Sequence, residues 1–145
     1  MLKLSKFTDY ATVILSLMAK QPSRLRTAIE IAEATHIALP TVSKILKLLT
    51  QAQVVMSIRG AKGGYLLARA PEQISIAAII SALEGPIALT ECSLSKHSCE
   101  QASGCGIRAN WHKINQTIHH ALESVSLADL ALPEEILIPV SSLTR

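Results

Sequence analysis

The sequence predicts a mainly α-helical protein with one small β-hairpin, in which a winged helix-turn-helix domain precedes a long dimerisation helix. Three observations support this fold class. Apolar residues recur at helical spacing behind N-cap residues in several segments. A glycine-rich hairpin pattern at residues 54–68 follows the third of these segments. Positive charge is concentrated in residues 1–70, which carry ten Lys and Arg against three acidic residues, whereas residues 71–145 carry four against eight.

The first helix is expected over residues 9–20. Thr8 is a suitable N-cap for it, and the Asp9 carboxylate lies in its first turn, where it complements the helix dipole. Helical spacing predicts an apolar stripe made of Val13, Ile14, Leu17 and Met18.

The next two helices are short and closely connected. Thr27 opens the second helix, and Glu30, three residues later, completes a capping box. Pro40 fits the first turn of the third helix, over residues 41–52. The buried face of this third helix is expected to be Val42, Ile45, Leu46 and Leu49. Two helices joined by such a tight turn form the helix-turn-helix pattern.

A hairpin directly after the third helix has the position of a wing, with strands at residues 54–58 and 65–68 around a glycine-rich turn. The alternative interpretation is that the helix pair and the hairpin have a structural role only, and that their charged side chains simply face solvent. The order of the elements, the charge and the glycines favour DNA binding. The predicted contacts, on the outer face of the third helix and the wing, are Thr41, Ser43, Lys44, Lys47, Arg59, Lys62, Gly63, Gly64 and Tyr65.

After the wing, Ser75 is expected to cap a helix that ends at Gly85-Pro86. A long helix then begins at residue 107 and runs to about residue 124, followed by a helical turn at residues 126–130. The apolar positions of the long helix step by four and three residues, a seam that needs a partner. At this length the better partner is a second copy, which predicts a dimer interface of Ile107, Trp111, Ile114, Ile118 and Leu122.

The predicted domain organisation has three parts. A winged helix-turn-helix domain covers residues 1–85, a cysteine-containing, cluster-binding loop covers residues 86–106, and the dimerisation helix and C-terminal tail cover residues 107–145. No structure is assigned to residues 134–145, which show no clear periodicity.

All three cysteines, Cys92, Cys99 and Cys105, lie in one polar segment with the spacing C-x6-C-x5-C. Its composition predicts a surface loop, where thiols have nothing to pack against. Disulfides do not account for an odd number of cysteines, and structural zinc sites favour C-x2-4-C pairs. Wider spacings among glycines favour an iron–sulfur cluster, with a zinc ion or redox-active thiols as alternatives. Any tetrahedral metal centre here needs a fourth ligand from elsewhere in the chain.

Other classes of protein are disfavoured. The sequence has no C-x-x-C motif, no glycine-rich phosphate cradle and no Ser/His/Asp set in a recognisable context, so no enzyme is expected. No apolar run reaches transmembrane length and no signal-peptide pattern opens the chain, which predicts a soluble, cytoplasmic protein without a membrane partner or a small-molecule substrate.

Six segments carry a family resemblance: FTDYA at residues 7–11, IALPTVSKILKLL, SIRGAKGGYLLA, GPIALTEC, NW-x-x-IN at residues 110–115 and VSLADL at residues 125–130. Together they resemble the Rrf-two (BadM) family of bacterial winged-helix repressors and activators, over residues 1 to about 132. This family includes members of the IscR and NsrR types and regulators of SUF iron–sulfur cluster assembly operons. The resemblance implies a homodimer that binds promoter DNA and holds an iron–sulfur cluster near the dimer interface.

The resemblance also bears on the fourth ligand. Members of the IscR type have a histidine three residues after the last cysteine, where this sequence has Arg108, which cannot ligate a metal. Members of the NsrR type use an aspartate of the partner subunit, in a motif that matches FTDYA. The implied metal ligands are therefore Cys92, Cys99, Cys105 and Asp9. His97 and His112 stay open as alternatives to Asp9, and the cluster can be [2Fe–2S] or [4Fe–4S].

The function that the resemblance implies is cluster sensing by a bacterial regulator of SUF assembly genes. Cluster status would shift promoter occupancy, because the two states of the dimer would bind DNA differently. The alternative is a zinc-stabilised or cluster-free winged-helix regulator that responds to nitric oxide or redox stress.

Overall fold

A computed structural model describes residues 3–131, apart from residues 96, 98 and 102. The tail at residues 134–145, to which the sequence assigned no structure, lies outside the described residues. In chain order the elements are α1 (Lys6–Ala19), α2 (Ala28–Thr35), α3 (Leu39–Gln51), β1 (Val55–Ile58), β2 (Gly64–Leu67), the 3-10 turn η1 (Pro71–Gln73), α4 (Ile76–Glu84), α5 (Glu91–Leu94), α6 (Arg108–Glu123) and α7 (Leu127–Leu130). The mainly helical fold with one antiparallel hairpin is the predicted one.

The start of α1 differs from the prediction. Ser5, and not Thr8, is the N-cap, and its side chain accepts a hydrogen bond from the Thr8 N–H at 3.2 Å. Thr8 is fully buried inside the first turn, where its hydroxyl donates to the Glu84 carboxylate at 2.8 Å. Thr8 therefore links α1 to the end of α4. Asp9 does lie in the first turn, as predicted.

The buried face of α1 is also rotated from the predicted stripe. Val13 is 44% exposed, whereas Ala11 and Leu15, which the stripe omitted, are fully buried beside Ile14. An apolar side chain on a helix is buried only if another element covers its face, and Ala11, Ile14 and Leu15 belong to the core cluster to which α3 and α4 also contribute.

Helices α2 and α3 confirm the helix-turn-helix pattern. Thr27 and Glu30 form the predicted reciprocal capping box, and α2 ends at His36, a residue in the left-handed conformation. Helix α3 begins at Leu39, two residues before the predicted start, with Pro40 in its first turn. Its buried face is the predicted one, Val42, Ile45, Leu46 and Leu49.

The hairpin is fastened to the start of α2. Val55 pairs with Leu67 and Ile58 with Gly64, and Tyr65 exchanges two backbone hydrogen bonds with Arg26 (2.7 and 3.0 Å). A Cβ atom at Gly64 would lie 2.6 Å from the Arg26 carbonyl oxygen, so only glycine allows this approach. The presence of glycine at position 64 of the predicted wing is thus explained by its contact with the chain's own backbone.

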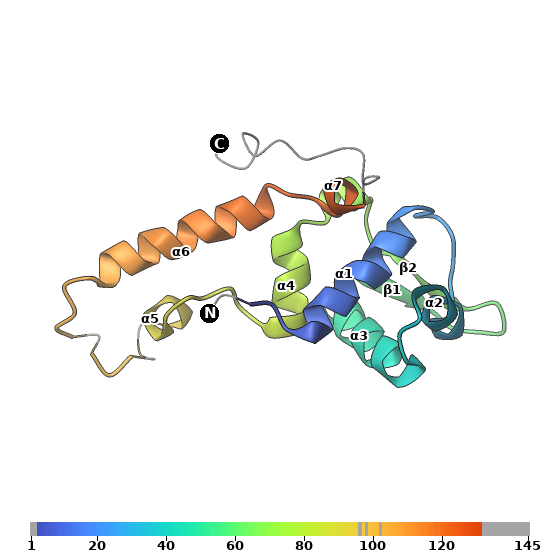
Figure 1. The fold of residues 1–145 in the computed structure, drawn as a ribbon, viewed down its shortest axis with the longest axis horizontal. Coiled ribbons are helices and arrows are strands. Elements are labelled where there is room, and N and C mark those ends of the chain that lie inside the picture. Colours follow the sequence, from blue (N-terminus) through green and yellow to red (C-terminus); the bar gives the residue numbers. More distant parts are fainter. Residues whose placement is uncertain (1–2, 96, 98, 102, 132–145) are drawn as a thin grey trace.

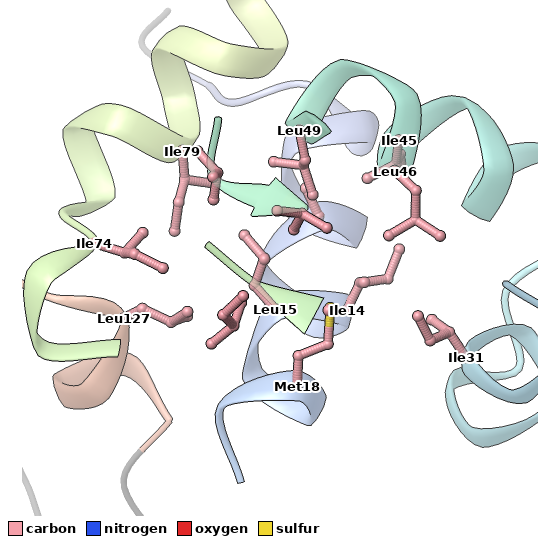
Figure 2. Packing of buried hydrophobic residues seen from close by; sticks show 14 of the residues in the cluster. Ile14, Leu15, Met18, Ile31, Ile45, Leu46, Leu49, Ile74, Ile79 and Leu127 are labelled. Carbon is pink, nitrogen blue, oxygen red and sulfur yellow. The ribbon is translucent and has the colours of Figure 1, made fainter. Parts of the chain in front are cut away.

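One apolar core joins α1 to α7, the first and last of the described helices (Figure 2). Leu127 of α7 is fully buried in it, although the sequence indicated only a helical turn there. Backbone bonds hold this return in place: Leu127 N–H donates to the Ile74 carbonyl at 2.7 Å, and Ile76 N–H donates to the Val125 carbonyl at 2.9 Å. Ser75 and Ser126 form an antiparallel bridge at the same place. Between them, α4 packs in the domain core, and the segment that follows α4 leaves the domain and returns through α6.

The segment that leaves the domain after α4 carries the three cysteines. In Figure 1, α6 runs away from α4 and α7, and its N-terminal end lies beside α5, at the opposite end of the molecule from α2 and the hairpin. Of the α6 residues only Asn115 is buried. The cysteine segment is therefore remote from the helix-turn-helix, and α6 is the element that spans the two.

Replacing Glu84 with glutamine is expected to make the thermal stability of the protein less dependent on pH in the acidic range. The Ser5 N–H donates to the Glu84 carboxylate at 2.6 Å, and this bond, with the Thr8 hydroxyl, holds the pKa of Glu84 below its ordinary value of 4.5. The stabilisation is then complete above about pH 4.5 and is lost as the pH falls through the lowered pKa. Melting temperatures of the wild type should exceed those of Glu84→Gln at neutral pH, and the difference should disappear as the pH falls through the lowered pKa. Glu72→Gln, an exposed carboxylate in η1, is the control, and an equal difference at every pH would contradict the expectation.

Candidate metal centre and nucleic-acid interface

Two of the three cysteines face one cavity of about 560 Å³. Cys92 reaches it from α5, and Cys105 reaches it from the residues that precede α6. The segment 91–94 was predicted to be loop, but it forms one turn of helix, whereas the described residues from Ser95 to Ile107 are loop as expected. The remaining lining residues are Ser93, Ser95, Gly106, Arg108, Ala109 and His112.

Cys99 lies outside the lining of this cavity, although it is half-buried. All three cysteines are free thiols. Among the residues that the structure describes, no three His, Cys, Asp or Glu side chains lie close enough together to hold a metal. In a metal-free chain the ligand side chains need not be close together, because the metal ion supplies the attraction that draws them into one site. Two thiols at one cavity and a third on the same loop are a donor set of the kind that iron–sulfur clusters use.

The surroundings of the cavity favour a negatively charged occupant. Arg108 lines it and has a permanent positive charge. Helix α6 also begins there without a side-chain cap, because its N-cap position is Ile107. The first N–H groups of a sixteen-residue helix and the positive end of its dipole are thus left for other partners. Cluster–thiolate assemblies carry net negative charge, so they match this environment.

The candidates for the fourth ligand occupy different places. His112 lines the cavity one helical turn after Arg108, and its Nε2 atom lies 3.2 Å from Nε2 of Gln116. Asp9 is exposed in the first turn of α1, and His97 is exposed in the loop; neither lines the cavity. Within a single chain, Cys92, Cys105 and His112 therefore line the same cavity, whereas Asp9 is exposed outside it.

In the helix-turn-helix, α3 presents the predicted outer face. Ser43, Lys44 and Lys47 are exposed, and Thr41 is half-buried. The Lys44 ammonium lies 5.0 Å from the centre of the Phe7 ring, which links α3 to the FTDYA segment of α1. The sequence did not indicate this contact, because it joins residues that are far apart in the chain.

The wing presents two cations. Arg59 and Lys62 are exposed in the turn between the strands, and Arg59 borders a groove of about 330 Å³ between the hairpin and the start of α2. Gly63 is half-buried, and a Cβ atom there would collide with the Ile58 carbonyl oxygen. Both strands and the first turn of α2 contribute to the groove, so the hairpin and helix-turn-helix form one continuous surface.

Replacing Lys62 with alanine is expected to weaken binding to every DNA sequence and to reduce the slope of log affinity against log salt by about one unit. The reason is that a wing lysine neutralises one phosphate without reading a base. The measurement is fluorescence anisotropy on specific and random duplexes at several salt concentrations. Lys113→Ala removes the same charge from α6, far from the wing, and should leave the slope unchanged (Figure 1). An unaltered slope for Lys62→Ala would rule out its contact with DNA.

The apolar stripe of α6 is largely uncovered within one chain. Ile107, Trp111 and Ile114 are 57%, 37% and 44% exposed. Ile118 and Leu122 are half-buried and line a groove of about 480 Å³, together with Leu4 and the end of α4. Uncovered apolar residues that continue into a groove have the form of an interaction surface. Among the described residues, no helix is long and apolar enough to cross a membrane.

Comparison with known proteins supplies the family. Residues 4–133 match the model of the Rrf2 family, described as iron-dependent transcriptional regulators. NsrR of Oceanobacillus iheyensis is 31% identical over 99% of both chains, and IscR of Sodalis glossinidius is 33% identical over 74% of this chain and 65% of its own length.

Solved structures agree with this result. The structure of CymR, the global cysteine regulator of B. subtilis, has a TM-score of 0.67 at 32% identity and matches 90% of this chain and 97% of its own. IscR of T. potens has a TM-score of 0.66 at 27% identity over 97% and 96%. The winged helix-turn-helix, the basic surface and these relatives lead to one conclusion: this chain belongs to the Rrf2 family of DNA-binding transcriptional regulators, and it is not an enzyme.

Proposed function

We propose that this chain is a homodimeric regulator that senses iron–sulfur clusters through Cys92, Cys99 and Cys105 and controls genes for SUF cluster assembly. The observation that carries the proposal is the cavity that Cys92 and Cys105 share beside the uncapped, positive end of α6. Thiolates are the ligands that iron–sulfur clusters require, and the cavity's charge favours an anion. The names of the IscR and NsrR relatives and the iron-dependent description of the family are consistent with it.

The proposed fourth ligand is Asp9 of the partner subunit. Within one chain Asp9 is exposed and does not reach the cavity, so its use requires a second copy. Glu84 ties the first turn of α1 to the end of α4, which directly precedes the segment leading to Cys92. The first turn of the helix that carries Asp9 is therefore hydrogen-bonded to the root of the cysteine segment, and the exposed Asp9 carboxylate is available to a partner's cysteine segment that packs there.

Homodimerisation is proposed to use the apolar stripe of α6. At 100° per residue, the five stripe positions span a narrow sector, and Asn115, which binds the chain's own backbone, lies at the edge of that sector. One face of α6 is thus committed to its own subunit, and the adjacent apolar face is available. Two copies that cross along this stripe would bury the exposed Trp111 and Ile114.

The chain's residues suggest how the cysteine segment communicates with DNA. When bound, the cluster would supply sensitivity to iron supply and oxidation. The N-terminal end of α6 lines the cavity, and its C-terminal end continues into α7, where Leu127 is anchored in the domain core. A change in the direction of α6 therefore changes how the two winged domains of a dimer are placed. Because two half-sites lie about one turn of DNA apart, such a change alters affinity.

Anaerobic reconstitution tests the proposal directly. Protein supplied with iron and sulfide should gain visible absorption and bound iron, and the Cys92→Ala, Cys99→Ala and Cys105→Ala variants should each retain less. The loaded and cluster-free forms should differ in affinity for a promoter fragment of a SUF gene cluster but not for a matched unrelated fragment. A colourless protein with stoichiometric zinc would support a zinc-stabilised regulator. A protein without metal whose DNA binding responds to nitric oxide or thiol oxidants would support the cluster-free alternative.

A further inference from the structure

The NW-x-x-IN segment contains a side chain whose role the family resemblance does not explain. Asn115 is the buried residue of α6, with 9% of its surface exposed. Its Oδ1 atom accepts a hydrogen bond from the Leu89 N–H at 3.0 Å, and its Nδ2 group donates to the Ile87 carbonyl at 3.1 Å. One amide therefore binds a carbonyl and an N–H two residues apart, as a neighbouring strand would.

The chemistry of this pair is specific for asparagine. The amide group offers one acceptor and a donor at the same end of a short side chain. Aspartate is similar in shape but cannot donate to Ile87, and leucine can do neither. Either change would leave a backbone group without its partner in a part-buried place, which is costly.

The position of Asn115 relates it to the cysteine cavity. Leu89 lies three residues before Cys92, on the outgoing side of the cysteine segment. On the returning side, Asn115 follows Arg108 by seven residues, which is two helical turns, so both lie on one face of α6. Arg108 lines the cavity that also receives Cys105. The amide thus joins the backbone that leads to Cys92 to the helix that begins three residues after Cys105.

We propose that Asn115 is a positioning residue that fixes the spacing of Cys92 and Cys105 before any metal binds. The inference rests on the proposed cluster function only for its purpose, because the clamp itself exists in the metal-free chain. Twelve residues separate the two cysteines in the sequence, and the clamp prevents the outgoing segment from sliding along α6. Preorganised thiols would lower the cost of closing the site around a cluster.

A thiol cross-linking experiment on metal-free protein tests this. In a Cys99→Ser background, the only remaining thiols are Cys92 and Cys105, and dibromobimane becomes fluorescent when it bridges them. Asn115→Asp should form the bridge at least severalfold more slowly than the parent, whereas Asn110→Asp, an exposed asparagine of the same helix, should match the parent. Leu89→Pro removes the donated N–H without changing α6, and it should reproduce the loss.

Cluster retention gives a second measurement on protein with all three cysteines. With a chelator under anaerobic conditions, the Asn115→Asp protein should lose visible absorption about tenfold faster, the size of effect typical when a residue that orients metal ligands is removed. If Asn115→Asp and Leu89→Pro both cross-link at the parental rate with intact helical circular dichroism, the clamp is overturned. If they slow the cross-link but the wild type takes up no cluster, the clamp stands and the proposed cluster function is wrong.

Discussion

Replacing Ile114 with glutamate is expected to convert the proposed homodimer into monomers and to abolish tight operator binding. Ile114 lies at the centre of the uncovered stripe of α6 and is 44% exposed in a single chain, so the substitution should not disturb the subunit's own core. In a two-fold interface the charge enters twice, and burying an unpaired charge costs several kcal/mol. Dimerisation should weaken by about a hundredfold or more, since each 1.4 kcal/mol is a factor of ten. Sedimentation velocity and anisotropy on a two-half-site duplex measure both effects.

Gln116→Glu is the matched control, because it adds the same charge to the same helix two residues later, on another face. It should remain dimeric and bind DNA normally. Thermal melts of both variants separate dissociation from unfolding. An intact Ile114→Glu dimer would mean that the stripe is covered by something other than a second copy.

Replacing Asp9 with alanine is expected to leave a folded dimer whose cluster has an altered absorption spectrum and is lost faster in air. The Asp9 side chain is exposed in the first turn of α1, and the capping there is done by Ser5, so folding does not depend on it. A carboxylate is a harder, weaker ligand for iron than a thiolate, which makes such a bond labile. Cluster lifetime should fall by about tenfold or more, the range seen when a ligand's environment is disturbed.

His112→Ala is the decisive comparison, because His112 lines the cavity in the same chain. It should leave both spectrum and lifetime unchanged, as should His97→Ala. If His112→Ala shortens the lifetime and Asp9→Ala does not, the ligand comes from α6 of the same subunit. Mixed dimers then add a further check: if the ligand crosses the interface, Asp9→Ala paired with a Cys92→Ala subunit should retain the same cluster content as wild type paired with that subunit, because the intact cysteine set still receives Asp9 from its partner. A ligand within the same chain would leave no complete site in the Asp9→Ala pair and would lower its cluster content.

Local signals predicted the fold well. The Thr27–Glu30 capping box, Pro40 in the first turn of α3, the Ser75 cap and the hairpin all depend on residues close in sequence, and each is present. The errors at Thr8 and Val13 have another origin. Thr8 is buried because Glu84, seventy-six residues later, receives its hydroxyl. Val13 is exposed because the core packs against the face of Ala11, Ile14 and Leu15, and neither fact is encoded within the helix itself.

The candidate site was predictable only in part. The number and spacing of the cysteines identify the segment that carries the metal ligands, because packing in a core does not account for thiols in a surface loop. That Arg108 and the uncapped start of α6 border the cavity follows from how the segment folds back on the helix. Asn115 appeared in the sequence only as part of a motif, since its partners are backbone groups twenty-six and twenty-eight residues away. No pattern of side chains reveals a contact with a peptide group.

The antiparallel bridge between Ser75 and Ser126 has a consequence for how such a regulator can diversify. The two ends of the intervening segment are hydrogen-bonded to each other, and Leu127 immediately re-enters the core. Lengthening or shortening the far end of that segment leaves the closure point untouched, and loop entropy grows only slowly with length. Sensor segments of different length can therefore replace one another on the same winged helix-turn-helix domain. A fragment that ends at residue 85 would lack Leu127, so the part of the core that Leu127 covers would be exposed to solvent.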